Sequence, residues 1–309
     1  MKENIIRKPV IVWVLALVCC ALWGSAFPAV KSGYVAFSVD TSDASSLILF
    51  GGCRFLIAGV LAIIIGSIAS KKVLIPKKSS MPKIFILSLC QTVGQYFFFY
   101  IGLANSTGVR ASILDGMSVF IAIFLACVIF RQEKLTGTKL IGSVIGFAGL
   151  VVVCLNGSTL EFGFTLLGDG FMLLSTAFYA FSSVLTKKFT QDESPFMLSG
   201  YQFCVGGIIM VVIGLLTGGY VAPVSAGSYV LLLYLGCISA VAYSLWGLLL
   251  KYNDVSRVTV FSFMTQVFGV VFSALILSEG NAINQYTLIA LILICAGIFI
   301  VNRSKNKPE

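Results

Sequence analysis

The sequence predicts an all-α integral membrane protein with ten transmembrane helices, arranged as two inverted five-helix repeats with both termini in the cytoplasm. Composition is the first observation behind this prediction. Of the 309 residues, 58% are hydrophobic and only 11% are charged, and the mean hydropathy is +1.01. One water-soluble core cannot bury that much apolar surface. We therefore expect a multi-pass protein of the cell membrane, either the inner or the plasma membrane, with the lipid bilayer as its partner.

The second observation is the length of the apolar runs. A helix needs about 20 apolar residues to cross the hydrocarbon core of a bilayer. The first half of the chain contains such runs at 10–30, 47–69, 84–104, 111–130 and 140–155. The second half contains them at 164–186, 196–216, 229–250, 258–277 and 286–301. The first run continues past a possible signal-peptide cleavage site, so we interpret it as a retained helix.

Basic residues indicate the orientation, because Lys and Arg concentrate in short cytoplasmic loops. Of the 21 Lys and Arg residues, Lys31 and Arg110 are the only two in predicted outer loops, and Arg54 falls inside the second span. The others flank the spans on the side that also holds both chain ends. The net charge of +9 is therefore a signal of membrane orientation, and no nucleic-acid partner is predicted.

The third observation is an internal repeat. Residues 23–31 resemble residues 179–187, and Glu133 at the end of span four corresponds to Glu279 at the end of span nine. The repeats are predicted as residues 1–155 and 156–309. Because each contains an odd number of helices, the second copy enters the membrane from the opposite side. Two inverted halves can exchange conformations, so that one site between them faces each side in turn, which is typical of transporters.

Several functional classes are disfavoured by what the sequence lacks. Without histidine, neither a Ser-His-Asp triad nor a zinc-binding His-Glu-x-x-His helix is possible. The nine cysteines lie in apolar runs without metal-ligand spacing. No P-loop is visible, so a carrier would draw its energy from a gradient. We predict no enzyme, no metal and no cofactor. A two-aspartate site, Asp115 with Asp169, is the enzymatic alternative, and a channel would need charge rings or a carbonyl filter.

Short motifs carry a family resemblance. They are ALWGSAF at 21–27, Arg54-Phe55-Leu56 in span two, Gly168-Asp169 at the start of span six, and Glu133 and Glu279 at two span ends. On these residues the chain resembles the EamA-type members of the drug/metabolite transporter superfamily over nearly its whole length. The proline usual midway along span four is absent, where the sequence reads MSVF at 117–120. The kink of that helix therefore lacks its usual cause.

The resemblance implies a secondary carrier that moves small organic solutes, such as amino acids and related metabolites, across the cell membrane by alternating access. Export is the expected direction, and a small-molecule substrate is the expected partner. A broad-specificity exporter of apolar drugs is the alternative among transporters. Either protein would act as a monomer or a homodimer.

Two charged residues fall deep inside predicted spans. Arg54 lies roughly 10 Å and Asp115 roughly 6 Å from the outer ends of their helices, at about 1.5 Å per residue. A charge facing hydrocarbon alone would cost about 2.5–3.5 kcal/mol or more, so we expect both side chains to face inward. Two interpretations follow: a salt bridge between them near the outer third of the membrane, or a charge-coupling role in handling substrate or protons.

Polar stripes mark the candidate substrate site. They are Gln91, Gln95, Phe98 and Gly102 in span three, and Ser262, Gln266, Gly269 and Ser273 in span nine. Tyr96 and Tyr100 are expected to point away from the glutamines, toward the outer membrane interface. A shared cavity needs a few oriented polar groups among aromatic walls, whereas hydrogen bonding between helices is the structural alternative. The predicted substrate-binding residues are Trp23, Gln91, Gln95, Phe98, Ser118, Tyr179, Ser183 and Gln266.

Other motifs are interpreted as structural. Gly142 and Gly146 form a GxxxG pair that predicts helix packing or a dimer contact. Glu133 and Glu279 lie at membrane borders, where solvated helix ends or loop capping are expected in preference to substrate contact.

Overall fold

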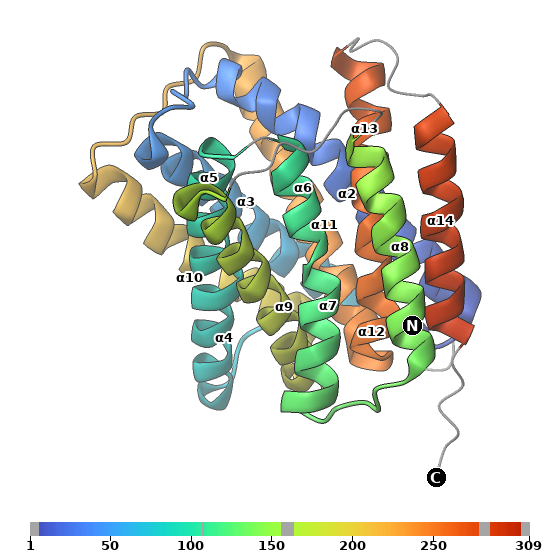
Figure 1. The fold of residues 1–309 in the computed structure, drawn as a ribbon. Helices are drawn as coiled ribbons and strands as arrows, with labels where there is room; N and C mark the ends of the chain where they lie inside the picture. Colours follow the sequence, from blue (N-terminus) through green and yellow to red (C-terminus); the bar gives the residue numbers. More distant parts are fainter. Residues whose placement is uncertain (1–5, 107, 156–163, 278–284, 304–309) are drawn as a thin grey trace.

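The computed structural model describes residues 6–106, 108–155, 164–277 and 285–303, which form a bundle of helices (Figure 1). The first half contains α2 (Pro9–Ala36), α3 (Ala44–Ser70), η1 (Lys78–Ser80), α4 (Met81–Leu87), η2 (Ser88–Gly94), α5 (Gln95–Ala104), α6 (Gly108–Gly116), α7 (Ser118–Phe124), η3 (Leu125–Ile129) and α8 (Gly137–Leu155). The second half contains η4 (Leu166–Gly170), α9 (Phe171–Phe189), α10 (Pro195–Leu216), α11 (Ala226–Tyr252), α12 (Val255–Thr259), η5 (Val260–Ser262), α13 (Phe263–Leu277) and α14 (Gln285–Arg303).

Helices occupy all ten segments predicted to span the membrane. Within the described residues, eight rods are long and apolar enough to cross a bilayer. The other two are α8, which is apolar but shorter, and α9, which carries several polar side chains. Exposed apolar side chains recur every four residues along the outer surface, as in Val10, Val14 and Val18 of α2. This spacing forms the apolar stripe that a lipid-facing helix requires.

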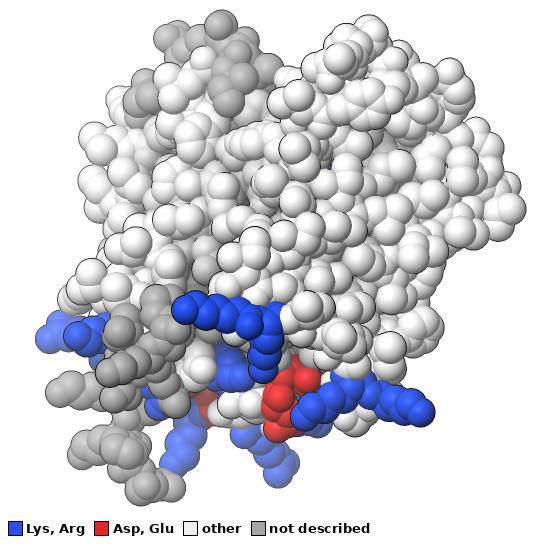
Figure 2. Space-filling view, turned by 180° about the vertical axis from the view of Figure 1, so that it is seen from behind, with Lys and Arg blue, Asp and Glu red and all other residues white. Residues whose placement is uncertain are grey.

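Charged side chains gather at one end of the bundle, below a broad uncharged belt (Figure 2). We call this the basic end. Its Lys and Arg residues are Arg7, Lys8, Lys71, Lys72, Lys77, Lys78, Lys83, Arg131, Lys134, Lys139, Lys187, Lys188, Lys251, Arg257 and Arg303. α2 begins and α14 ends at this end, where Pro9 and Arg303 line the same surface hollow. α2 therefore runs away from the basic end, whereas α9, whose last turn contains Lys187 and Lys188, runs toward it.

Several of the membrane-spanning segments are irregular helices. The third predicted span contains the π-helical segment η2, and the fourth is interrupted at Met117, between α6 and α7. The fourth span therefore breaks without a proline. At this break Gly116 packs against α8, where a Cβ atom would lie 2.0 Å from the Leu150 side chain. Glycine leaves room there for the leucine side chain. In contrast, α2 passes through Pro28 as a continuous helix.

Glycines form the contact between α3 and α10, which pack extensively. A Cβ atom at Gly59 would lie 2.7 Å from the Gly200 carbonyl oxygen, and one at Gly52 would lie 3.0 Å from the Gly207 carbonyl oxygen. Only glycine permits backbones to approach this closely. One shift in numbering takes Gly52 to Gly200 and Gly59 to Gly207, so the two contacts are copies of each other.

The same shift relates the contacts between α8 and α14. A Cβ atom at Gly297 would lie 2.5 Å from the Gly142 carbonyl oxygen, and one at Gly149 would lie 2.8 Å from the Ala290 carbonyl oxygen. The shift takes Gly142 to Ala290 and Gly149 to Gly297. Gly146 lies against Phe263 of α13. The GxxxG pair therefore packs within the chain, as the packing interpretation predicted, and both helix pairs reproduce one twofold arrangement of the halves.

A leucine at Gly59 should destabilise the fold, because its side chain would start 2.6 Å from the Cys204 sulfur and 2.7 Å from the Cys204 amide nitrogen. Overpacking of this kind costs about 1–3 kcal/mol. We expect Gly59→Leu to lower the melting temperature of the detergent-solubilised protein. The matched control is Val60→Leu, since Val60 is 52% exposed on the lipid-facing surface. Equal melting temperatures for the two variants would contradict this account of the contact.

Candidate functional site

An aromatic group fills the middle of the bundle. The ring of Trp23, on α2, packs edge-on against Tyr243 and Trp246 of α11, with ring centroids 5.2 and 5.0 Å apart. The hydroxyls of Tyr96, on α5, and Tyr243 are hydrogen-bonded at 2.9 Å. The indole nitrogens of Trp23 and Trp246 are buried without a hydrogen-bond partner. The aromatic group therefore contains residues from both halves of the chain. Its two indole N–H groups are free to donate hydrogen bonds to a ligand.

Arg54 lies beside this group, on α3. Its side chain is only 5% exposed, and one terminal nitrogen donates a 2.9 Å hydrogen bond to the Ser239 hydroxyl of α11. Its guanidinium carbon lies 5.4 Å from the centroid of the Phe55 ring, and its Nε has no partner. Tyr96 is within electrostatic range of Arg54. The prediction that Arg54 faces inward is confirmed.

Asp115, on α6, is half-buried. Its carboxylate makes no hydrogen bond or ion pair within the described part of the chain. Tyr96, Tyr179 and Cys154 lie within its electrostatic range. The predicted salt bridge between Arg54 and Asp115 is wrong, since Arg54 is directed to Ser239 on another helix.

The polar stripe of the third span does not line one cavity. Gln91 is buried and accepts a hydrogen bond from Gln202 of α10. Phe98 faces α9, where it stacks on Phe178 with ring centroids 5.6 Å apart. Gln95 is half-buried, and its side-chain oxygen has no partner. The structural alternative, hydrogen bonding between helices, therefore describes Gln91, whereas Gln95 keeps a free acceptor.

The remaining predicted residues divide between packing and the interior. Ser183 donates to the Tyr179 carbonyl oxygen of its own helix at 2.9 Å, and Ser118 is buried. Tyr179 is half-buried, within range of Asp115 and Ser262. Gln266 is half-buried and has no hydrogen-bond partner within the described residues. In the same stripe, Gly269 packs against Gly24 of α2, and the side chain of Ser273 lies outside the described residues.

Tyr96 and Tyr100 were missed by the sequence analysis. They were expected at the membrane interface, but Tyr100 is 3% exposed and Tyr96 bonds to Tyr243 inside the bundle. The prediction assumed 100° per residue through the whole span. The π-helical segment η2 ends directly before Gln95, and its wider turn rotates every later side chain. The amino-acid composition of the segment does not indicate a π-helical turn, so the direction of the later side chains could not be predicted from it.

The basic end is closed by a buried ion pair. Lys139 at the start of α8 donates to Glu133 at 2.6 Å, and both side chains are at most 1% exposed. Glu133 also accepts hydrogen bonds from the backbone nitrogen and the hydroxyl of Ser256, in the first turn of α12. A carboxylate in this position caps the helix and complements its dipole. Of the two roles expected of Glu133, capping describes its position, whereas the solvated helix end is wrong because its side chain is buried. Glu279 lies outside the described residues.

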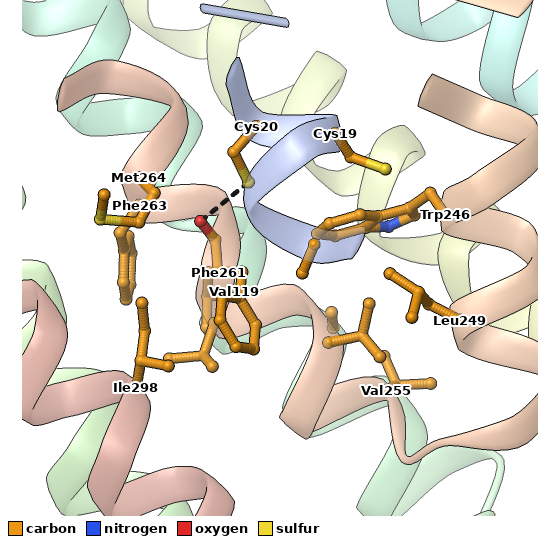
Figure 3. Close-up of a cluster of buried hydrophobic side chains, with 14 of the residues drawn as sticks. Cys19, Cys20, Val119, Trp246, Leu249, Val255, Phe261, Phe263, Met264 and Ile298 are labelled. Carbon is orange, nitrogen blue, oxygen red and sulfur yellow. Dashed lines mark hydrogen bonds between the residues drawn. The ribbon is translucent and has the colours of Figure 1, made fainter. Parts of the chain in front are cut away.

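Apolar packing extends this closure toward the aromatic group (Figure 3). Trp246, Leu249, Val255 and Phe261 are each at most 1% exposed. Cys20 of α2 donates its thiol hydrogen to the Phe261 carbonyl oxygen at 3.1 Å. Further polar contacts tie the basic end together: Lys187 donates to the Asn253 carbonyl oxygen and Gln132 to that of Val184. The basic end is therefore closely packed.

Asp169 has a structural position. Its carboxylate accepts hydrogen bonds from the Thr165 backbone nitrogen at 2.9 Å and from the Ser106 hydroxyl at 3.0 Å. It thereby fastens the start of η4 to the loop after α5. Asp115 makes no hydrogen bond to Asp169 or to its partners Thr165 and Ser106 within the described residues, so the structure does not assemble the two-aspartate site. Among the described residues, no cluster of Cys, Asp and Glu could hold a metal ion.

Fold and site together define a multi-pass membrane protein with a polar and aromatic site in its interior. The EamA-like transporter family model matches residues 10–155 and 166–303. The chain therefore belongs to the EamA-like transporter family, a family of transporters and not of enzymes.

Known relatives agree with this assignment. An Archaeoglobus fulgidus protein named an uncharacterized transporter is 28% identical over 75% of this chain and 80% of its own length. A protein of Streptantibioticus cattleyicolor named a probable terminal-alkyne amino-acid exporter is 24% identical over 94% of this chain and 93% of its own length. A solved crystal structure shares the fold, with a TM-score of 0.77 and 18% identity over 94% of this chain and 98% of that chain.

Removing one partner of the buried pair should be costly, because the other charge is left uncompensated. We expect Glu133→Gln and Lys139→Met each to destabilise the protein by about 3–5 kcal/mol. The double variant Glu133→Gln/Lys139→Met should be more stable than the sum of the two effects implies. Thermal unfolding in detergent measures all three. Strictly additive losses would show that the two charges do not act as a pair.

Proposed function

We propose that the chain is a secondary carrier that moves amino acids or related small metabolites across the cell membrane by alternating access, in the direction of export. It is built from two inverted five-helix repeats, residues 1–155 and 156–309. The observation that carries the proposal is the interior site, where unpartnered polar groups from both halves meet among aromatic side chains. Carriers place their substrate at the interface of such halves.

The paired helix contacts support the inverted repeat. The α3–α10 and α8–α14 contacts map onto themselves when the halves are exchanged, and α2 and α9 run in opposite directions. A twofold axis in the membrane plane produces both features. Exchange of conformation between the halves would then open the site to the other side.

The closely packed basic end supports both an orientation of the protein in the membrane and the side on which this conformation is closed. Because Lys and Arg gather there, we assign it to the cytoplasm, together with both termini. α9 packs on α11 near this end, whereas α2 and α5, the corresponding pair at the other end, make far less contact within the described residues. This conformation is therefore the one closed to the cytoplasm.

Polar groups in the site favour small metabolites over apolar drugs. Arg54 Nε, Trp23 Nε1 and Gln95 Oε1 are buried without partners. An apolar drug would leave these groups unpaired, at about 1–3 kcal/mol each. A solute with complementary hydrogen-bonding groups satisfies them.

Counterflow tests the carrier function. Purified protein in liposomes is loaded with one unlabelled L-amino acid at a time, and entry of the labelled form is followed. Transient accumulation of at least one amino acid is expected. If folded protein exchanges no amino acid or related metabolite, the proposal fails, and accumulation of apolar dyes in the same liposomes would favour the drug exporter.

Asp115 is the proposed coupling residue, because its carboxylate is enclosed and unpaired within the described residues. Asp115→Asn should reduce proton-gradient-driven uptake at least about tenfold while exchange at equilibrium persists, since exchange needs no net proton movement. The matched control is Asp192→Asn, which alters an exposed carboxylate at the basic end. Unchanged gradient-driven uptake by the Asp115 variant would rule out this role.

A further inference from the structure

Arg54 is a buried cation without a counter-ion in the described part of the chain. One terminal nitrogen donates to a neutral hydroxyl, that of Ser239, the Tyr100 hydroxyl lies within hydrogen-bonding reach of the guanidinium, and Nε has no partner. A desolvated guanidinium is stable only when an anion or several oriented dipoles compensate its charge. The ion pair that would make Arg54 a structural residue is therefore missing.

The acidic residues near the bundle are engaged elsewhere. Ion pairs occupy four of them: Glu133 pairs with Lys139, Asp192 and Glu193 both pair with Lys83, and Asp254 pairs with Arg257. Asp40 and Asp43 accept hydrogen bonds in the loop before α3. Asp169 accepts hydrogen bonds before α9. Asp115 remains, and it makes no ion pair with Arg54. No described carboxylate is thus free to neutralise Arg54 without moving.

Four tyrosine side chains lie near the guanidinium: Tyr34, Tyr96, Tyr100 and Tyr243. Phenol hydroxyls can donate hydrogen bonds to an anion as well as accept them. The rings of Phe55, Trp23 and Tyr243 provide apolar surface beside them. The combination is a positive centre with hydroxyl donors, next to an aromatic wall.

We propose that Arg54 binds the carboxylate of the transported solute, and that the aromatic group accommodates an apolar or aromatic remainder. This inference rests on the proposed carrier function and narrows its substrate class to carboxylates. The planar guanidinium matches a carboxylate with two parallel hydrogen bonds, one of which can come from the free Nε. The substrate then supplies the negative charge that the protein lacks at this point.

The experiment compares acids with their amides. Competition for counterflow, and quenching of tryptophan fluorescence in detergent, are measured with L-phenylalanine against L-phenylalaninamide and L-leucine against L-leucinamide. A Trp13→Phe background restricts the signal to Trp23 and Trp246, since the chain contains three tryptophans. We expect each amide to bind at least about 30-fold more weakly than its acid, because it loses the charge-assisted pair.

Two variants separate substrate binding from helix packing. Arg54→Gln should lose the preference for acids, so that acid and amide bind within about twofold of each other. Ser239→Ala removes the same interhelical hydrogen bond but keeps the charge, and should retain the preference. If Arg54→Gln does not fold, Arg54→Lys keeps the charge and should retain a weaker preference for acids.

The outcomes distinguish this proposal from the carrier function. Equal binding of acid and amide by the unmodified protein, no binding of either, or a preference retained in Arg54→Gln would each overturn the Arg54 assignment. Counterflow could still occur in those cases, and the carrier function would then stand. Conversely, acid-selective quenching without counterflow would keep the carboxylate site and remove the carrier.

Discussion

The buried ion pair between Glu133 and Lys139 holds the basic end of the bundle in one arrangement. Its two charges have no access to water, so their stability depends on each other and on the hydrogen bonds from Ser256. Glu133 follows the fourth rod, Lys139 begins α8, and Ser256 begins α12, so one carboxylate fastens both halves together. The apolar layer of Trp246, Phe261 and their neighbours packs above this point (Figure 3).

This closure explains why the interior can retain unpaired polar groups. A bilayer offers no hydrogen bonds, so a polar side chain inside it must find a partner in the protein, in water or in a ligand. At the basic end the buried charges of Glu133 and Lys139 are paired with each other. In the middle of the bundle Arg54 Nε, Trp23 Nε1 and the Asp115 carboxylate have no hydrogen-bond partner within the described residues.

The arrangement of the halves depends on glycine in a complementary way. At Gly59 and Gly297 the backbones of partner helices come too close for any side chain. These contacts join α3 to α10 and α8 to α14, each between one half and the other. Each pair maps onto itself when the halves are exchanged, so both contacts reflect the duplication of the halves.

Sequence patterns predicted the helices well and the side-chain geometry in part. The ten segments, the packing role of Gly142 and the capping role of Glu133 followed from apolar length, GxxxG spacing and position at a membrane border. The orientations of Tyr96 and Tyr100 did not, because the π turn before Gln95 shifts the helix phase. Gln91 and Gln95 likewise share a face only in a regular helix, and the former binds Gln202 instead.

The sequence by itself determined that this chain is a helical membrane protein, because bilayer thickness sets the length of the apolar runs. It also determined that the halves are duplicated, because corresponding residues in the two halves match. Only the tertiary structure decided which polar groups meet. Arg54 and Asp115 are both buried charges by sequence, yet whether two such groups pair depends on helix rotation and on neighbours distant in the chain. Ser239 and the four tyrosines come from segments far from Arg54 in sequence, so packing alone brings them to it.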